Sequence, residues 1–323
     1  ESRGLGDVYK RQMLYRLDDS TQAAVIEMGM NHAGEIHRLS QTVAPTIGLI
    51  TNIGVSHIEN LGSREGILNA KLEILDGMQP GSPLVLNIDN DLLKTVKRQD
   101  YPLITFAVED KSADFVAKDF VESDGKTTFT VQNAEFVQQV TIPTVGIHNV
   151  YNALAAFAVG ALCQVDAKAA AAALADYVPA GMRQRNRMVG DVHVIEDCYN
   201  ASPDSMQAAL TTLRNVKSGK KIAVLADMLE LGDYSKTAHE AVGRMAAENG
   251  IDNLLAYGSE AAAYVSAAQE SGLQNAVHFD TKEELADRLY QIAEKGDTVL
   301  FKGSRGMKLE EVMNLIYKRW ERE

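Results

Sequence analysis

Apolar runs and helix-like segments alternate through the first 90 residues of the chain. Residues 23–28, 46–53 and 83–88 are apolar runs that predict buried β-strands. Segments 34–43 and 63–78, which lie between these runs, have helical spacing. Strands that alternate with helices form mostly parallel sheets, so a parallel α/β sheet is expected.

The pattern changes between about residues 113 and 142, where apolar and polar residues alternate with a period of two. This alternation, interrupted by turn residues, predicts a hairpin meander beside the first sheet. Helices are predicted at 149–163 and at the alanine-rich segment 167–177. The Pro-Ala-Gly sequence at 179–181 then breaks the pattern, and we place a domain boundary there.

The remainder of the chain again alternates between strands and helices. Strands are predicted near residues 192–196, 221–226, 253–257, 276–279 and 298–301. Helices are predicted at 203–216, 237–249, 260–271, 282–295 and 309–320. This order predicts a second, Rossmann-like α/β domain.

Composition narrows the classes of function. A chain of 323 residues that is 46% hydrophobic can bury two cores. Its 44 acidic and 32 basic residues give a net charge of -12, which argues against a broad nucleic-acid or anionic-membrane surface. No apolar run approaches the roughly 20 residues of a membrane span, so no membrane insertion is expected. Cys163 and Cys198 have neither disulfide-framework nor zinc-site spacing. We therefore expect a cytoplasmic protein, as a monomer.

Two polar residues at predicted strand ends suggest a metal site. Glu27 lies in a Glu-Met-Gly sequence at the end of the first strand, and His57 follows the second. Adjacent strand ends of this kind could share a Mg²⁺ ion. The alternative is a surface glutamate and a helix-capping histidine. Lys71, two turns into the next helix, could lie near the metal or could be an ordinary solvated lysine.

Further polar residues are placed where a nucleotide or an anion could bind. Asn149 and Asn152 lie one helical turn apart, where their amides could contact a base edge, although Asn149 could also be a simple helix cap. Asp197 ends a predicted strand, a common position for a ribose-binding acid. The sequence Lys302-Gly-Ser-Arg-Gly306 combines two cations with glycines that permit close approach to an anion, or it forms a basic turn.

Six motifs together resemble those of the Mur ligases of peptidoglycan synthesis. They are Glu27-Met-Gly, Thr51-Asn-Ile-Gly-x-x-His57, Ala70-Lys71, His148-Asn-Val-Tyr-Asn152, Asp197-x-Tyr-Asn-Ala-x-Pro-Asp-Ser-Met206 and Lys302-Gly-Ser-Arg-Gly-Met307. The resemblance runs from about Met13 to the end of the chain. Within the family, these segments and Ala226-Asp-Met-Leu-Glu-Leu-Gly232 look most like the members that act on UDP-N-acetylmuramoyl-tripeptide and D-alanyl-D-alanine.

The resemblance implies an ATP-dependent amide synthesis that proceeds through an acyl phosphate. It implies that Glu27 and His57 bind Mg²⁺, and that Lys71 reacts with CO2 to form a carbamate. Such a carbamate would be an anion that attracts the metal.

The resemblance also implies roles for residues near the two substrates. Asn149 and Asn152 would face the adenine, Arg183 the phosphates and Asp197 the ribose. Lys71, Lys302 and Arg183 would be the catalytic residues. The looser assignments to the peptide substrate and the acyl phosphate are Asn200, Ser202, Ser304 and Arg305.

The chain also departs from the family pattern at its beginning. Family members carry an amino-terminal domain for the UDP-sugar and a Gly-Lys-Thr phosphate loop that opens the central domain, and we find neither in this sequence. We therefore expect residues 1–12 to be a non-family leader and 13–180 to be an incomplete central ATP-binding domain. Residues 181–323 would then be the C-terminal domain, and the chain alone would be inactive.

Other functions are compatible with the sequence. A Mur ligase that adds a single amino acid is the nearest alternative, followed by a folylpolyglutamate-synthase-like enzyme. From a different class, the chain could be a non-catalytic remnant that still binds a nucleotide or a peptide.

Overall fold

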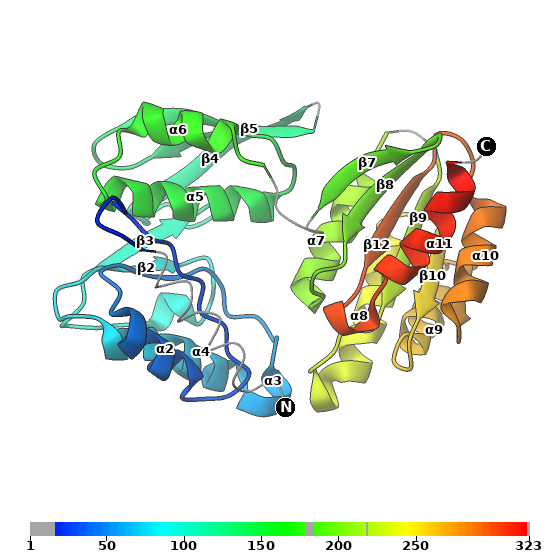
Figure 1. Ribbon diagram of the computed structural model, residues 1–323, viewed down its shortest axis with the longest axis horizontal. Helices are drawn as coiled ribbons and strands as arrows, with labels where there is room; N and C mark the ends of the chain where they lie inside the picture. Colours follow the sequence, from blue (N-terminus) through cyan, green and yellow to red (C-terminus); the bar gives the residue numbers. More distant parts are fainter. Residues whose placement is uncertain (1–16, 124, 179–183, 218, 322–323) are drawn as a thin grey trace. The chain divides into compact units, whose positions relative to one another are not determined.

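The computed structural model describes residues 17–123, 125–178, 184–217 and 219–321. These residues form two compact units (Figure 1). Unit 1 contains the described residues up to Ile142 together with Asn149–Ala175, and unit 2 contains Pro143–His148 and the described residues from Asp176 onward. Each unit has its own six-stranded sheet.

The sheet of unit 1 is parallel on one side and antiparallel on the other. Its strands follow in chain order: β1 (Gly48–Ile50), β2 (Leu84–Asn87), β3 (Leu103–Ala107), β4 (Phe115–Ser123), β5 (Lys126–Gln132) and β6 (Val137–Ile142). The pairs from β1 to β4 are parallel, and the pairs from β4 to β6 are antiparallel. The predicted parallel sheet with an added meander is thus confirmed, although β3 was not predicted.

Helices cover both faces of this sheet. Val85 packs into a cluster with α5 (Ile147–Leu162) and α6 (Ala167–Ala175), whereas its neighbours Leu84 and Leu86 belong to the cluster on the other face. This alternation follows from the two-residue period of a strand. The second cluster holds α2 (Glu35–Val43), α4 (Arg64–Leu72) and the 3-10 helix η1 (Glu73–Gly77). Figure 1 shows α5 on one side of the sheet and α2 with α4 on the other.

The strand predicted at residues 23–28 is wrong. The structure has no regular secondary structure between residues 22 and 30, and Val25 is 95% exposed. A strand needs a hydrogen-bonded neighbour, and among the described residues β1 pairs only with β2. The apolar run therefore lacks the ladder partner that would make it a strand.

The sheet of unit 2 places its last strand in the interior. Its order is β11 (Ala276–Phe279), β10 (Asn253–Tyr257), β9 (Lys221–Ala226), β12 (Thr298–Lys302), β8 (Val192–Asp197) and β7 (Arg185–Val189). Only the β7–β8 pair is antiparallel. The predicted α/β class is confirmed, and the one strand that was not predicted is the polar edge strand β7.

Helices also cover both faces of the second sheet. The helices α10 (Lys282–Ile292) and α11 (Glu310–Trp320) pack side by side on one face, over alternate residues of β9 and β12 (Figure 1). The helix α7 (Pro203–Arg214) contacts β9 and β12 and packs against α8 (Ser235–Glu248), which in turn packs against α9 (Ala262–Glu270). Among the helices of the described residues, none is both long and apolar enough to cross a membrane.

Candidate functional site

Two loops meet at the carboxyl edge of the unit 1 sheet. Because β1 and β2 are parallel neighbours, residues 51–57 after β1 and residues 88–91 after β2 leave the sheet at the same edge. The Asn90 Nδ2 donates hydrogen bonds to Asn52 Oδ1 at 2.8 Å and to the Ile53 carbonyl at 3.2 Å. Arg64 donates to the same Ile53 carbonyl at 2.9 Å and pairs with Asp91. The loop after β1 is therefore held both by Asn90, from the loop after β2, and by Arg64.

Lys71 lies on α4, and its side chain turns toward this loop. Ser63 caps α4 by accepting a hydrogen bond from Gly66 N–H. The Lys71 ammonium donates to the Asn52 carbonyl at 2.6 Å, and burial lowers the pKa of this lysine. A lower pKa increases the neutral fraction of the amine at a given pH, and the neutral amine is the nucleophilic form.

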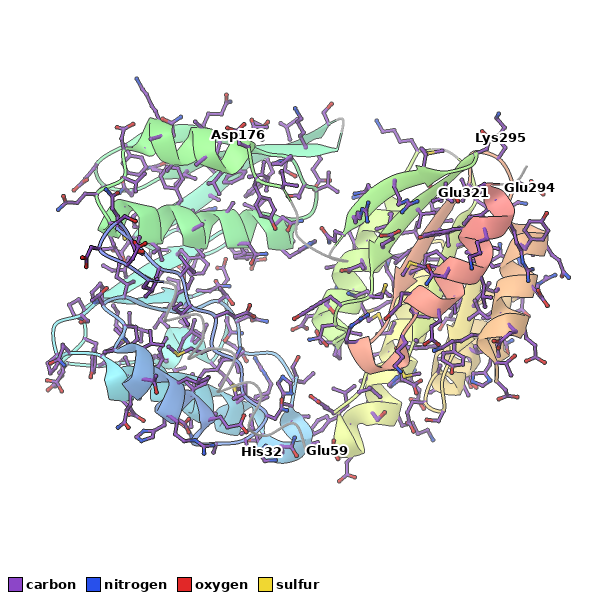
Figure 2. The ribbon with its side chains drawn as sticks, viewed as in Figure 1. His32, Glu59, Asp176, Glu294, Lys295 and Glu321 are labelled. Carbon is purple, nitrogen blue, oxygen red and sulfur yellow. The ribbon has the colours of Figure 1, made fainter. Side chains whose placement is uncertain are left out.

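The two predicted metal ligands have different settings. His57 precedes the short helix α3 (Ile58–Leu61) and has a φ of 64°, a left-handed conformation uncommon for residues other than glycine. Glu27 is exposed and lies outside any strand, so its expected position at a strand end is wrong. In the view of Figure 2, His32 and Glu59 both lie at one end of unit 1, and Glu59 belongs to α3.

Few described side chains near these two residues could serve as metal ligands. Within the described part of the chain, no group of three or more His, Cys, Asp or Glu side chains could hold a metal ion. Mg²⁺ commonly uses one or two protein carboxylates and takes its other oxygens from phosphates and water. If Glu27 and His57 bound a metal they would offer one oxygen and one nitrogen, and a carbamate on Lys71 would add the oxygen chemistry that Mg²⁺ prefers.

Asn149 and Asn152 lie in the first turns of α5. The helix begins at Ile147, so Asn149 is its third residue and not its cap. Asn149 is half-buried and Asn152 is exposed, and their spacing of three residues puts both amides on one side of the helix. Tyr151 points elsewhere and donates its hydroxyl to Asp89 Oδ2 at 2.7 Å.

The structure brings Asp197 and Lys302 together in unit 2. They are the last residues of β8 and β12 and face each other in the parallel register. Lys302 Nζ lies 2.6 Å from Asp197 Oδ2 and 3.2 Å from the Asn200 carbonyl. The Lys302 side chain is only 2% exposed, and that of Asp197 is 13% exposed. The lysine is thus a buried partner of the aspartate and is not a free surface cation.

The other carboxylate oxygen of Asp197 accepts a hydrogen bond from the Gln184 N–H at 3.4 Å. The Gln184 side chain lies 2.6 Å from the His148 Nε2 atom. A chain of polar contacts thus connects His148, Gln184, Asp197 and Lys302 within unit 2. Arg183, the predicted phosphate ligand, lies outside the described residues.

The residues after β8 shape the start of α7. Asn200 Oδ1 accepts from the Ala201 N–H at 2.8 Å. Ser202 caps α7 in a reciprocal arrangement with Ser205, and Pro203 occupies the first helical turn. Ser202 therefore has a structural role in addition to its predicted contact with substrate.

The loop after β9 is held by Ser304, which sequence reasoning assigned to the substrate, and by His239, which it did not identify. Ser304 Oγ accepts from Leu229 N–H at 2.9 Å, and Ser304 N–H donates to the Asp227 carbonyl at 3.1 Å. The fully buried His239 accepts from Met228 N–H through Nε2 at 3.0 Å, and its Nδ1 lies 2.7 Å from the Ser235 carbonyl. Because Nε2 accepts the Met228 N–H it carries no proton, and Nδ1 donates to the Ser235 carbonyl, so this histidine is the neutral tautomer. Burial lowers its pKa.

Asp227 directly follows β9, at the same edge of the sheet as Asp197 at the end of β8. It is buried, and this burial raises its pKa. The signal that pointed to Asp197, an acid directly after a strand, was also present for Asp227. Arg305, by contrast, is exposed and pairs with Glu310 at 2.6 Å. Glu294 and Lys295, labelled in Figure 2, directly precede β12 and so lie at the opposite edge of the sheet.

The fold and the site thus define a two-unit α/β protein with polar side chains at the carboxyl edges of both sheets. A family model described as the Mur ligase middle domain matches residues 7–160. A second, described as the Mur ligase glutamate ligase domain, matches residues 182–305. The chain belongs to the Mur ligase family.

Individual relatives give a more specific comparison. A UDP-N-acetylmuramoyl-tripeptide--D-alanyl-D-alanine ligase of Bacillus subtilis is 38% identical over 92% of this chain, which spans 65% of that protein's length. The ligase of the same name from Escherichia coli is 33% identical over 96% of this chain, which spans 68% of that protein.

Solved structures agree with these relatives. A crystal structure of MurF from Acinetobacter baumannii has a TM-score of 0.87 at 29% identity and covers 97% of this chain and 68% of its own. The MurF ligase of Thermotoga maritima in complex with ADP has a TM-score of 0.80 at 27% identity, with 92% and 67% covered.

Proposed function

We propose that this chain belongs to an ATP-dependent ligase that joins D-alanyl-D-alanine to UDP-N-acetylmuramoyl-tripeptide in peptidoglycan precursor synthesis. The observation that carries the proposal is the match, over 92% of the chain, to a ligase of that name. The polar edges of both sheets support it, because they place the matching motifs where α/β sheets bind ligands. We further propose that the protein acts in the cytoplasm as a monomer.

The proposed reaction has two steps. A carboxylate oxygen of the tripeptide attacks the γ-phosphorus of ATP, giving an acyl phosphate and ADP. The amine of D-alanyl-D-alanine then attacks the acyl carbon, an amide bond forms, and phosphate leaves as the amine loses a proton. Both steps gather negative charge, so fixed cations and hydrogen-bond donors stabilise them.

Mg²⁺ would neutralise charge on the transferring phosphate. In this proposal Glu27 and His57 hold the ion, together with Lys71 after it has reacted with CO2. The reaction forms a bond between Nζ of the neutral amine and the CO2 carbon and releases one proton. The lowered pKa of Lys71 supports this step, because it raises the concentration of the reactive neutral amine.

The proposed nucleotide contacts are those that the family resemblance implies. Asn149 and Asn152 would bind the adenine, Arg183 the phosphates and Asp197 the ribose. Lys302 was expected to be catalytic, but its ammonium is bonded to Asp197 and the Asn200 carbonyl. We therefore assign it a positioning role, in which it fixes the Asp197 carboxylate.

The peptide and the acyl phosphate would meet Asn200, Ser202, Ser304 and Arg305. Ser304 Oγ already accepts the Leu229 N–H, which leaves its own proton free to be donated. Such a donor suits a carboxylate or phosphate oxygen. Arg305 is exposed enough to exchange Glu310 for a substrate anion.

The experiment that tests this function is a phosphate-release assay with ATP, UDP-N-acetylmuramoyl-tripeptide and D-alanyl-D-alanine. It should use the complete product of the encoding gene and, in parallel, these 323 residues, which are expected to be inactive alone, with the Bacillus subtilis relative as a positive control. Phosphate release that needs both peptide substrates, together with a product of the expected mass, supports the proposal. Release with a single amino acid in place of D-alanyl-D-alanine would instead indicate a different Mur ligase.

A binding measurement covers the remaining alternative. Tight binding of ADP or of the muramoyl peptide without any phosphate release, by the complete product of the encoding gene, would favour a non-catalytic binding protein. Substituting Lys71 by Met should also abolish a carbamate signal in a ¹³C NMR spectrum recorded with ¹³C-bicarbonate. If parent and variant give the same spectrum, the Lys71 assignment is wrong.

A further inference from the structure

We propose that Asp89 and Tyr151 are positioning residues that fix the nucleotide-facing turns of α5. This inference rests on the proposed function, because it assumes that Asn149 and Asn152 contact the nucleotide. Neither Asp89 nor Tyr151 was among the predicted site residues.

Asp89 is the centre of an unusually complete hydrogen-bond set. Its Oδ2 accepts from Val108 N–H at 2.6 Å and from Glu109 N–H at 2.9 Å, and its Oδ1 accepts from Asp110 N–H at 2.8 Å. The Tyr151 hydroxyl donates to Oδ2 at 2.7 Å. One carboxylate after β2 thus joins the loop that follows β3 to the helix α5.

The charge of Asp89 strengthens these bonds. Burial by itself raises its pKa, but the hydrogen bonds from Glu109, Tyr151, Val108 and Asp110 outweigh burial and hold the pKa below its usual value. The carboxylate is therefore ionised at neutral pH. Hydrogen bonds to an ionised acceptor are shorter and stronger than those between neutral groups.

The helix geometry gives Tyr151 a supporting role. At about 100° per residue, Tyr151 lies roughly 160° around the helix from Asn149 and about 100° from Asn152. The tyrosine consequently anchors the side of α5 that points away from the paired asparagine amides. Through Tyr151, Asp89 would fix the rotation of α5 about its axis and its position along that axis, without touching the nucleotide.

The burial of residues along α5 also distinguishes a side that faces the core from the side that carries the asparagines. Val150, Ala153 and Leu154 pack into the core of unit 1, whereas Asn152 is exposed. Apolar packing resists separation of the helix from the sheet but is not directional. The Tyr151–Asp89 bond adds the directional restraint at the end of the helix where the asparagines lie.

The test compares Tyr151→Phe with Tyr101→Phe, both in this chain. Tyr101 is a matched control, because its half-buried hydroxyl donates to the Leu75 carbonyl at 3.1 Å in the same unit. We expect Tyr151→Phe to weaken ADP binding, measured by titration calorimetry, by up to about tenfold, because the loss of one hydrogen bond to a charged group sets the upper limit of an effect that reaches the nucleotide only through α5. Tyr101→Phe should leave the Kd unchanged, although it also removes a tyrosine hydrogen bond of unit 1 and lowers stability, by less than Tyr151→Phe because its acceptor is uncharged.

Hydrogen exchange supplies a second readout that needs no ligand. The backbone amides of Val108, Glu109 and Asp110 should exchange faster in Asp89→Asn than in the parent, as should the first turns of α5. Tyr151→Phe should accelerate the α5 amides alone. Tyr101→Phe should change neither region.

The outcomes separate this inference from the proposed function. If the parent chain fails to bind ADP, the proposed nucleotide site is wrong and the positioning role falls with it. If the parent binds ADP and Tyr151→Phe binds it equally well, only the positioning role is overturned. A Tyr101→Phe variant that loses as much affinity as Tyr151→Phe would also overturn it, because the loss would then follow stability.

Discussion

At the scale of single residues, the buried pair Asp197 and Lys302 combines two opposed effects. A lysine with a 2% exposed side chain has lost almost all of its hydration, and among the described residues the carboxylate and the Asn200 carbonyl replace it. Pairs of this kind add little net stability, but breaking one of them leaves an uncompensated charge.

We therefore expect Asp197→Asn to lower the free energy of unfolding by about 3–5 kcal/mol. The double variant Asp197→Asn with Lys302→Met should recover most of that loss, because it leaves no unpaired charge. Urea unfolding of the single and double variants measures this coupling. Effects that simply add would show that the two side chains do not depend on each other.

Gly258 has a conformation and a neighbour that exclude other residues. Its φ is 125°, and a Cβ built there would lie 2.3 Å from Asp227 Oδ1. We expect Gly258→Ala to cost roughly 2–4 kcal/mol, from backbone strain and from displacement of a buried carboxylate. Gly272→Ala is the control, because Gly272 has a φ of 98° but open space around its Cβ. Equal losses in thermal or urea unfolding would contradict a role for the contact with Asp227.

Acid should destabilise unit 2 through its buried histidines. Burial lowers the pKa of His239 and of His193 below the ordinary value of 6.5. Between the folded pKa and 6.5 the unfolded state binds more protons, so stability falls as the pH drops through that window. The raised pKa of Asp227 acts in the opposite sense. Between pH 3.8 and its folded pKa the folded state binds more protons, so stability falls as the pH rises through that window.

We expect the unfolding free energy to decrease as the pH falls below 6.5, by at most about 1.4 kcal/mol per pH unit for each histidine. In His239→Gln the remaining slope should be that of His193 alone. Urea unfolding at several pH values provides the measurement. A slope that His239→Gln does not change would mean that His239 is protonated equally in both states.

At the scale of elements, the start of α4 depends on one hydroxyl. Ser63 Oγ accepts the Gly66 N–H at 3.1 Å, and α4 carries Lys71. Ser63→Ala should cost about 1 kcal/mol, whereas Ser63→Gly should cost only a few tenths of that amount. Far-ultraviolet circular dichroism during urea unfolding can compare the two. Similar losses for both variants would indicate that the cap is not what stabilises this helix.

Most elements could be predicted because their apolar spacing matches their burial. The strands at 192–196, 221–226 and 253–257 reappear as β8, β9 and β10 with ends shifted by no more than one residue. The strand β3 was missed because it is short and no functional motif follows it, although its Phe106 and Ala107 are fully buried. The strand predicted at 23–28 was wrong for a different reason: an apolar pattern predicts burial but does not supply the hydrogen-bonded neighbour that a strand needs.

Individual residues of the candidate site could be predicted from the sequence, but the contacts between them could not. Asp197 and Lys302 were each assigned to a strand end, but 105 positions separate them, and only the strand order makes them neighbours. Their pairing was therefore invisible in the sequence. Asn90 was missed for a similar reason, because its importance arises from Asn52 on another loop.

At the scale of the whole molecule, each unit has its own hydrophobic core, so we expect two unfolding transitions. The single tryptophan, Trp320, is buried in the core of unit 2 and stacks on Tyr317. Its fluorescence should therefore follow unit 2, whereas circular dichroism follows both units. Gly258→Ala should shift the fluorescence transition, and Ser63→Ala should leave it in place. A fluorescence midpoint that moves equally in both variants would show that the units unfold together.

The interior position of β12 has a consequence for how the protein is made. This strand pairs with β8 on one side and β9 on the other, although it follows all the other strands of its sheet along the chain. While the chain is emerging from the ribosome, β8 and β9 therefore have no common neighbour, and their facing edges stay open until β12 arrives. Unit 2 must wait for its last strand, and during that interval the nascent chain offers exposed edges to chaperones.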